Sequence, residues 1–255
     1  IFVRETGSLN ITGNAHFLNN VARGGSSNND GAAGDGAGAA LFMMKGSSVT
    51  LSPDVGETIT FDDYIADNSS ATYEGAPYAE GDGADIIVHG AGGLVVFNVE
   101  NTYSGNTILQ GSTLDAELGV GLHDSSRLVF NGGGTIGSGT LSQDGVGTFL
   151  LRDDFTERRA GLDDFEVQWS GSGGFASAVA EGVVVNLGES VPGLGLGQTL
   201  TWGSDGFFDN ADGVGDPDVL RNADAPMATL TFGSNQSRGS VEFANDVVIP
   251  VGQTA

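Results

Sequence analysis

Residues 93–114 constrain the fold of this chain more than any other segment, because they place two short apolar strands on either side of a polar turn. In the first strand, Val95 and Phe97 occupy alternate positions, so one side of the strand can face a core. The turn reads Asn-Thr-Tyr-Ser-Gly, and the part that follows it carries Leu109 and Leu114. The segment therefore predicts one turn of a coil built from short β-strands.

The rest of the chain repeats this pattern of short strands and tight turns. Its 255 residues include 43 glycines but only 6 prolines, with no Gly-X-Y period, which excludes collagen and indicates frequent turns. No stretch shows a sustained helical period of apolar residues. We therefore expect an all-β fold with almost no helix.

A unit of two short strands cannot bury its apolar side alone, so successive units must stack, as they do in repeat proteins. The sequence thus predicts a right-handed parallel β-helix, a solenoid, formed by a single domain over 1–255. Small polar stretches at 24–40, 67–83 and 205–225 are predicted to leave the coil as loops. An antiparallel sandwich is the competing architecture, but the usual two-residue hairpin spacings are absent. The residues predicted to share one core include Val95, Phe97, Leu109, Leu114, Leu200, Trp202, Leu230 and Phe232.

Residues 93–114 resemble the passenger-associated transport repeat of autotransporters, whose usual form is Gly-Thr-Leu-Thr-Leu, then Asn-Thr-Tyr-Thr-Gly-Gly-Thr, then Gly-Thr-Leu. Asn106 stands where the repeat has its second glycine, and Ser112 stands where it has the glycine before Thr-Leu. Residues 17–20, Phe-Leu-Asn-Asn, are similar to the Phe-x-x-Asn signature of polymorphic outer-membrane proteins, and residues 38–41 are similar to their Gly-Gly-Ala-Ile signature. The resemblance implies a role in secretion, since the repeat is associated with vectorial folding as the passenger leaves the outer membrane.

Charge restricts the partners of the chain. The formal net charge is −24 and Lys45 is the single lysine, which argues against nucleic acid and against anionic lipid surfaces. The absence of cysteine excludes disulfides and thiol catalysis, and it suits a secreted bacterial protein. No apolar run is long enough to span a membrane, and the chain opens on Ile1, so we expect a segment of a longer protein. Contact with the membrane is then expected only through a barrel elsewhere in the parent protein.

Few residues indicate catalysis. The three histidines, His16, His89 and His123, are predicted to be packing or surface residues, and no Gly-x-Ser-x-Gly elbow occurs. A polysaccharide-cleaving β-helix would instead need clustered carboxylates with basic partners along one face. Adjacent acidic pairs and one arginine cluster could supply these, although such pairs are usually solvated turns in so acidic a chain: Asp62-Asp63, Asp153-Asp154, Asp163-Asp164, and Arg152, Arg158 and Arg159.

Two segments resemble calcium-binding sequences. Residues 80–87, Glu-Gly-Asp-Gly-Ala-Asp-Ile-Ile, look like one nonapeptide of the repeats-in-toxin type, but a single copy is interpreted as a loop that enters a strand. Residues 209–218 combine carboxylates, one asparagine and glycines in the manner of Asp-x-Asp-Gly calcium turns, although the full EF-hand spacing is absent. The candidate metal ligands are Asp209, Asp212, Asp216 and Asp218. No other cofactor is expected.

These patterns predict a non-catalytic extracellular scaffold on the bacterial cell surface, within an autotransporter-like passenger. Its loops would contact a cell-surface or extracellular ligand, a glycan or a protein, and its repeat would assist folding during secretion. Two alternatives remain. One is a polysaccharide-active β-helix enzyme, and the other is a self-assembling filament, because the uncapped ends of a coil expose strand edges that favour end-to-end pairing.

Overall fold

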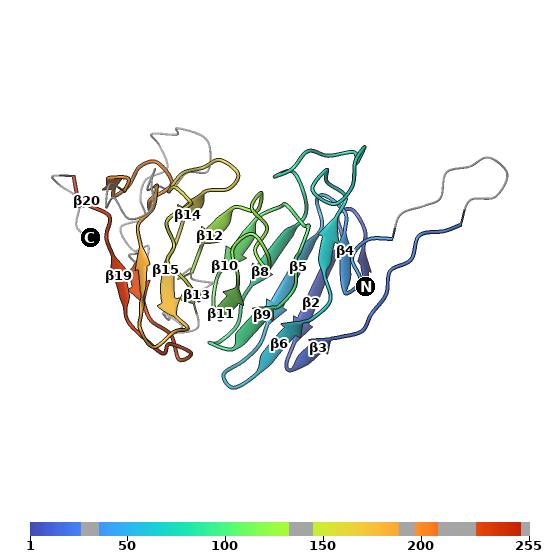
Figure 1. Cartoon of the computed structure of the whole chain (residues 1–255), viewed down its shortest axis with the longest axis horizontal. Coiled ribbons are helices and arrows are strands. Elements are labelled where there is room, and N and C mark those ends of the chain that lie inside the picture. The colour runs from blue at the N-terminus through green and yellow to red at the C-terminus, as the bar shows by residue number, and fades with distance from the viewer. Residues whose placement is uncertain (27–35, 133–144, 189–196, 209–227, 251–255) are drawn as a thin grey trace, which may run out of the picture.

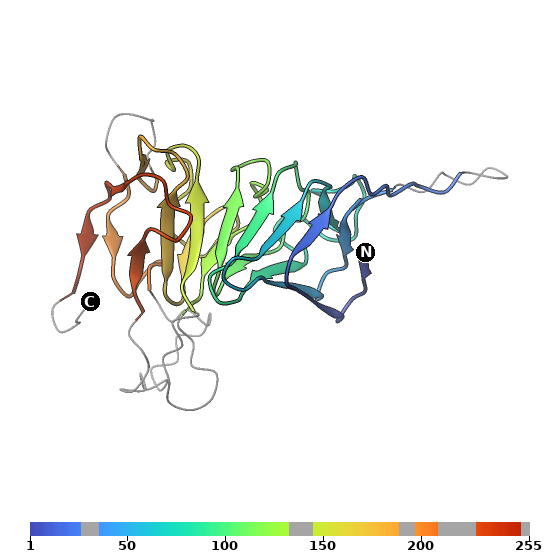
Figure 2. The ribbon, with the colours of Figure 1, turned by 90° about the horizontal axis from the view of Figure 1, so that it is seen from below.

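The strands of this protein are stacked side by side along its longest axis, and each strand runs across that axis (Figure 1). The computed structural model describes residues 1–26, 36–132, 145–188, 197–208 and 228–250. Within these ranges the chain forms β-strands and no helix, which confirms the all-β expectation for the described part. Figure 2 shows the N-terminal strands at one end and the C-terminal strands at the other.

Three sheets hold most of the strands, and every pair of named strands is parallel. The first sheet contains β1 (Phe2–Val3), β4 (Leu41–Met43) and β7 (Ile65–Asp67). The second contains β2 (Ser8–Thr12), β5 (Ser48–Ser52), β8 (Asp85–Val88), β10 (Thr107–Leu109), β12 (Leu128–Phe130) and β14 (Val167–Trp169). The third contains β3 (Ala15–Phe17), β6 (Thr58–Phe61), β9 (Leu94–Phe97), β11 (Thr113–Ala116), β13 (Gly147–Leu151), β15 (Gly173–Ser177) and β18 (Leu230–Phe232).

Two further parallel pairs lie near the C-terminal end. They are β16 (Val183–Val185) with β19 (Val241–Phe243), and β17 (Leu200–Thr201) with β20 (Val247–Val248). From β2 to β15 the chain alternates between the second and third sheets, with β4 and β7 of the first sheet inserted after β3 and β6, and each return to a sheet adds a strand beside the previous one. This order is compatible with a solenoid, and the uniformly parallel pairing of the named strands excludes the antiparallel sandwich for the part of the chain that they form.

The core lies between the sheets because alternate strand residues point inward. In β5, β6, β8 and β9 every second side chain is buried, as the period of two requires. Parallel in-register pairing then stacks like residues, so Phe17, Phe61 and Phe97 occupy equivalent positions in three neighbouring strands. The rings of Phe17 and Phe61 are stacked with centroids 4.4 Å apart, and Phe61 meets Phe97 edge to face at 5.5 Å.

The predicted core residues divide into three groups. Five are at most 1% exposed: Val95, Phe97, Leu109, Leu114 and Leu200. Trp202 and Leu230 are only partly buried, but they pack against the same core. The prediction is wrong for Phe232, which is 47% exposed. It is in register with the buried Phe175, but β18 is the terminal strand of its sheet among the described residues, so its outer side lacks a neighbouring strand.

Tight turns link the strands, and one glycine shows what they require. Gly90 follows β8 at a φ of 112°, and a Cβ atom there would lie 2.5 Å from the Pro53 carbonyl oxygen of the preceding turn. Only glycine combines this backbone conformation with so close an approach. The turns of neighbouring units are therefore stacked as closely as the strands.

Of the predicted loops, residues 67–83 are wholly described. Asp67 ends β7, and the chain from 68 to 84 projects beyond the strand ends before β8 begins (Figure 1). The loops predicted at 24–40 and 205–225 lie partly outside the described residues. The described residues on both sides of 27–35 run away from the sheets (Figure 1).

Candidate functional site

The polar residues of the 93–114 turn are buried inside the protein, where they join three successive passes of the chain. Asn101 is fully buried; its side-chain oxygen accepts a hydrogen bond from the Ile65 amide at 2.8 Å, and its Nδ2 donates to the Gly121 carbonyl at 2.8 Å. One side chain thus satisfies backbone groups both before and after its own turn. Buried polar groups without such partners would be costly, so this asparagine fixes how the turns stack.

Tyr103 anchors the other side of the same turn. Its hydroxyl shares a hydrogen bond with Thr107 Oγ1 at 2.7 Å, which in turn shares one with Ser126 Oγ at 2.8 Å. Ser126 then donates to the Gly105 carbonyl at 2.6 Å. All three side chains are fully buried, and burial raises the pKa of the Tyr103 hydroxyl to about 12. The tyrosine therefore acts as a neutral hydrogen-bonding core residue at physiological pH.

Asp67 joins the 67–83 loop to the same turn. Its buried carboxylate accepts hydrogen bonds from the amides of Ser69 at 2.9 Å, Ala84 at 3.3 Å and Ser104 at 2.7 Å. A Cβ atom on Gly83 would lie 1.7 Å from Asp67 Oδ2, so the site requires glycine there. The carboxylate is satisfied by the protein itself and is not available to a ligand.

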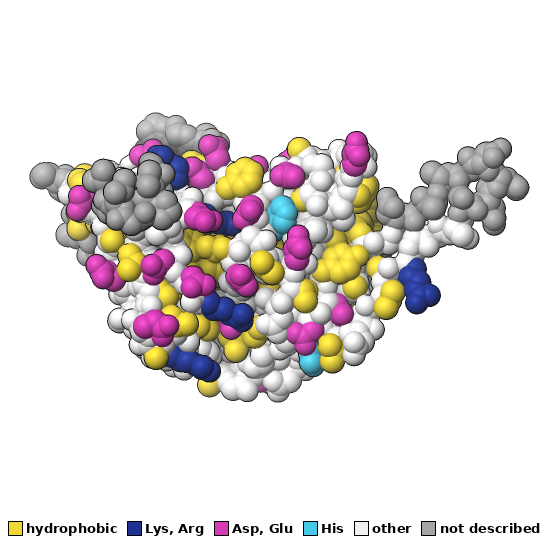
Figure 3. Space-filling model, in the orientation of Figure 1, with side chains coloured by type: hydrophobic (Ala, Val, Ile, Leu, Met, Phe, Trp, Pro, Cys, Tyr) yellow, Lys and Arg dark blue, Asp and Glu magenta, His cyan; other side chains and the backbone are white. Residues whose placement is uncertain are grey.

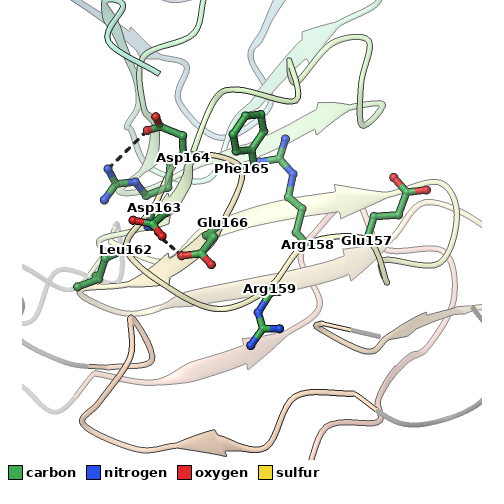
Figure 4. A pocket seen from close by; sticks show the side chains of 9 residues that line it. Glu157, Arg158, Arg159, Leu162, Asp163, Asp164, Phe165 and Glu166 are labelled. Carbon is green, nitrogen blue, oxygen red and sulfur yellow. Dashed lines mark hydrogen bonds and ion pairs between the residues drawn. The ribbon is translucent and has the colours of Figure 1, made fainter. Parts of the chain in front are cut away.

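A groove on the surface offers the best candidate binding site (Figure 4). Its volume is about 680 Å³, within the range of small-molecule sites. The apolar side chains in its lining are Leu162 and Phe165. The charged ones are Arg127, Arg158 and Arg159, and Glu157, Asp163, Asp164 and Glu166. The groove thus gathers three of the nine basic residues of a very acidic chain. Figure 3 shows acidic side chains spread over one face with few basic ones among them.

Arg158 forms the floor of this groove and is 6% exposed. Its guanidinium donates to the carbonyl of Ser126 at 2.5 Å and to that of His123 at 3.0 Å. Loss of hydration lowers the pKa of Arg158 to about 10, a value at which it still carries its charge at neutral pH. This arginine therefore ties the segment around 158 to the preceding 123–126 turn.

A tight turn over residues 161–166 presents the apolar part of the groove. The Glu166 carboxylate accepts a hydrogen bond from the Asp163 amide at 2.8 Å, and a Cβ atom on Gly161 would lie 1.8 Å from that carboxylate. Phe165 has a φ of 68°, a conformation that is strained for a bulky residue, and its side chain is 51% exposed. Leu162, 40% exposed, lies in the same turn.

The other two arginines keep unused hydrogen-bonding capacity. Arg127 contacts Gln168 Oε1 at 3.3 Å and Asp164 Oδ1 at 4.0 Å, while its Nε is buried and has no hydrogen-bond partner in the described part of the chain. Arg159 is exposed, and its guanidinium has neither a hydrogen bond nor an ion pair with the residues that the structure describes. An under-satisfied donor in a groove wall is a candidate for ligand contact.

The acidic pairs considered from sequence have different surroundings. Asp62 accepts hydrogen bonds from Asn98 Nδ2 at 2.8 Å and from His16 Nε2 at 2.5 Å, and these bonds lower its pKa, that from Asn98 most. Asp63 accepts from the amide and side chain of Asn20, both at 2.7 Å. Asp154 accepts from the Val184 amide at 2.7 Å. Of the three pairs, only Asp163-Asp164 lines the groove.

The arginine cluster is also divided. Arg158 and Arg159 line the groove, whereas Arg152 donates from Nε to Asp115 Oδ1 at 2.8 Å and lies outside the lining. Arg127 was not singled out by sequence reasoning, because it lies 31 residues before Arg158 in the sequence and only the stacking of strands brings it near the other two arginines of the lining. Among the histidines, His123 Nδ1 accepts a hydrogen bond from the Ser125 amide at 3.2 Å.

The possible calcium sites stay predictions. Asp209, Asp212, Asp216 and Asp218 lie outside the described residues. In the described part of the chain, no three His, Asp or Glu side chains form a group that could hold a metal ion.

The carboxylates of the 80–87 segment all have protein partners. Glu80 accepts from Ser125 Oγ at 2.8 Å, Asp82 pairs with Lys45 Nζ at 2.9 Å, and Asp85 accepts from the backbone and side chain of Asn106. Burial raises the pKa of the Asp85 carboxyl, although the bonds from Asn106 oppose that shift. This segment is a loop that enters strand β8, as the sequence suggested.

Comparison of the chain with known protein families, characterised proteins and solved structures gives no match. Among the residues that the structure describes, no helical segment has the length and hydrophobicity that a bilayer crossing needs.

Proposed function

We propose that this chain is part of a right-handed parallel β-helix in the passenger of an autotransporter-like protein, and that it serves as a non-catalytic extracellular scaffold. Its parallel sheets and the alternating visits of the chain to them support the coil. The proposed role of the 93–114 segment is to hold its own turn against the turns before and after it as they form during secretion. Its projecting loops and surface groove would then contact a ligand outside the cell.

One observation carries this proposal: the polar side chains of the 93–114 turn bond to neighbouring turns rather than to solvent. Asn101 spans from Ile65 to Gly121, and the Tyr103 hydroxyl reaches Ser126 through Thr107. Such bonds favour addition of one turn at a time, as in repeat proteins whose units contact only their neighbours. This is the behaviour expected of a segment that drives vectorial folding.

A surface-display experiment tests the scaffold role. The chain is fused to the translocation unit of an autotransporter, and its exposure on intact cells is measured with a protease added outside. Asn101→Ala should lower display severalfold and leave chains in the periplasm, because two backbone groups lose their buried partner. Asn98→Ala is the matched control, since Asn98 is an exposed asparagine that bonds Asp62. Equal display of N101A and wild type would refute the role in secretion.

A polysaccharide-active enzyme is the second candidate, because the groove brings the Asp163-Asp164 pair close to arginines. An enzyme should release reducing ends from acidic or neutral polysaccharides, and Asp163→Asn or Asp164→Asn should abolish that release. Release that depends on these carboxylates would overturn the non-catalytic assignment.

A further inference from the structure

We infer that the groove around Phe165 binds a neutral glycan segment. This inference rests on the proposed extracellular role and specifies the ligand that the scaffold presents. It depends on three features of the groove: an exposed aromatic surface, free donors beside acceptors, and a charge balance unlike that of the rest of the chain.

The aromatic surface is held out by the backbone. Phe165 is 51% exposed although it is a large apolar residue, and its φ of 68° is a strained backbone conformation for a bulky side chain. The surrounding turn maintains this geometry, because Glu166 binds the Asp163 amide and Gly161 leaves room for that carboxylate. A flat apolar ring fixed beside a groove is a surface on which the C–H face of a sugar ring can pack. Leu162 extends this surface.

Hydroxyl groups of a sugar both donate and accept hydrogen bonds, and the groove offers both kinds of partner. Arg159 supplies donors with no partner among the described residues, and Arg127 is held only loosely, at 3.3 Å from Gln168 and 4.0 Å from Asp164. Asp164 and Asp163 supply carboxylate acceptors in the same lining. Guanidinium groups only donate and carboxylates only accept, so together they suit a polyhydroxyl ligand.

Charge favours a neutral ligand over a charged one. The net charge of −24 repels polyanions from the molecule as a whole, and four carboxylates line the groove itself. The three arginines in the same lining nearly balance the four carboxylates, so the groove presents little net charge of its own to a cationic ligand. A neutral glycan needs no net charge in the groove and can bond to either kind of group.

Calorimetric titration of the full chain tests the inference. The probes are cellohexaose, maltohexaose, laminarihexaose, mannohexaose and xylohexaose, with hexagalacturonate as the anionic comparison, each raised to millimolar concentration. At least one neutral hexasaccharide should bind, and hexagalacturonate should bind more weakly than that sugar. Phe165→Ala should lower the affinity at least tenfold, and Arg159→Gln severalfold. Phe232→Ala removes another half-exposed phenylalanine outside the groove lining and should leave the affinity unchanged.

Phe165→Gly separates binding from folding. Glycine adopts a positive φ without strain, so this variant should melt at a temperature no lower than wild type while it loses affinity as F165A does. The inference is overturned if no neutral hexasaccharide binds, if hexagalacturonate binds more tightly than all of them, or if both Phe165 variants bind like wild type. None of these binding results tests the role in secretion, which the surface-display experiment measures separately. Release of reducing ends in the same mixtures would contradict the non-catalytic assignment.

Discussion

Truncation of Phe97 to alanine should destabilise the protein strongly, because the ring lies within the stacked core between the parallel sheets. Phe97 is 1% exposed and contacts Phe61 at a centroid distance of 5.5 Å and Tyr103 at 6.3 Å, both edge to face. Removal of a buried phenylalanine typically costs about 3–5 kcal/mol. Each lost aromatic pair accounts for about 0.5–1.5 kcal/mol. We expect the free energy of unfolding to fall by an amount in the upper half of the range of about 3–5 kcal/mol, since rigid stacked strands leave little freedom to close the cavity.

Urea titration followed by tryptophan fluorescence measures this loss, and hydrogen exchange shows whether it is local. Phe232→Ala is the matched control, since Phe232 lies in the same sheet and is in register with inward residues, but it is 47% exposed. Among the described residues its aromatic partner is Phe243, with ring centroids 5.4 Å apart, so we expect a loss of about 1 kcal/mol. A loss below about 1 kcal/mol for F97A, or equal losses for the two variants, would refute the assignment of Phe97 to the core.

Three further substitutions test the polar contacts. Gly83→Ala should lower the unfolding midpoint markedly and raise protease cleavage within 68–83, because the new methyl group would displace the Asp67 carboxylate. Unchanged cleavage would contradict the role of Asp67 in joining this loop to the 93–114 turn. Asp85→Asn should stabilise the protein at pH 7 but not near pH 3. Because the pKa of the Asp85 carboxyl is raised in the folded protein, wild type loses stability as pH rises from 3.8 through that folded-state pKa and the buried carboxyl ionises. Asp62→Asn should have the opposite effect: it should destabilise the protein at pH 7, and the difference should vanish as pH falls below 3.8. The reason is that a lowered pKa means the folded protein favours the ionised carboxylate. For either variant, a difference in urea midpoint that does not change with pH would refute the assignment.

Alternation of side chains made the strands and much of the core predictable. Val95 and Phe97 are separated by one residue and both are buried, as the period of two in a strand requires. The same rule failed at Phe232, because alternation shows which side of a strand a residue faces and not whether another strand follows. Whether a strand lies inside a stack or at its end depends on the whole chain. A few residues around one strand do not carry that information.

Polar interactions were harder to predict than apolar ones. The Asn-Thr-Tyr-Ser-Gly turn was visible, but nothing local shows that Asn101 would bond to residues 36 positions before it and 20 after it. Asp67 gave a similar difficulty, since its carboxylate binds amides as far away as Ser104. These contacts depend on the number of residues between successive strands of one sheet, which loops such as 67–83 alter without changing the strands.

Adjacent arginines show why the candidate groove could not be derived from sequence. Arg158 and Arg159 are chemically identical neighbours, but Arg158 is buried and bonded to the carbonyls of Ser126 and His123, whereas Arg159 is exposed, and the two side chains extend in opposite directions (Figure 4). Ser126 also belongs to the hydrogen-bonded chain that begins at Tyr103, so Arg158 is linked to the repeat-like turn through that serine. The floor of the groove is therefore part of the folding core. Arg159 and the Phe165 turn belong to the exposed part of the lining and make none of these buried bonds, so substitutions there should change the groove while those bonds stay in place.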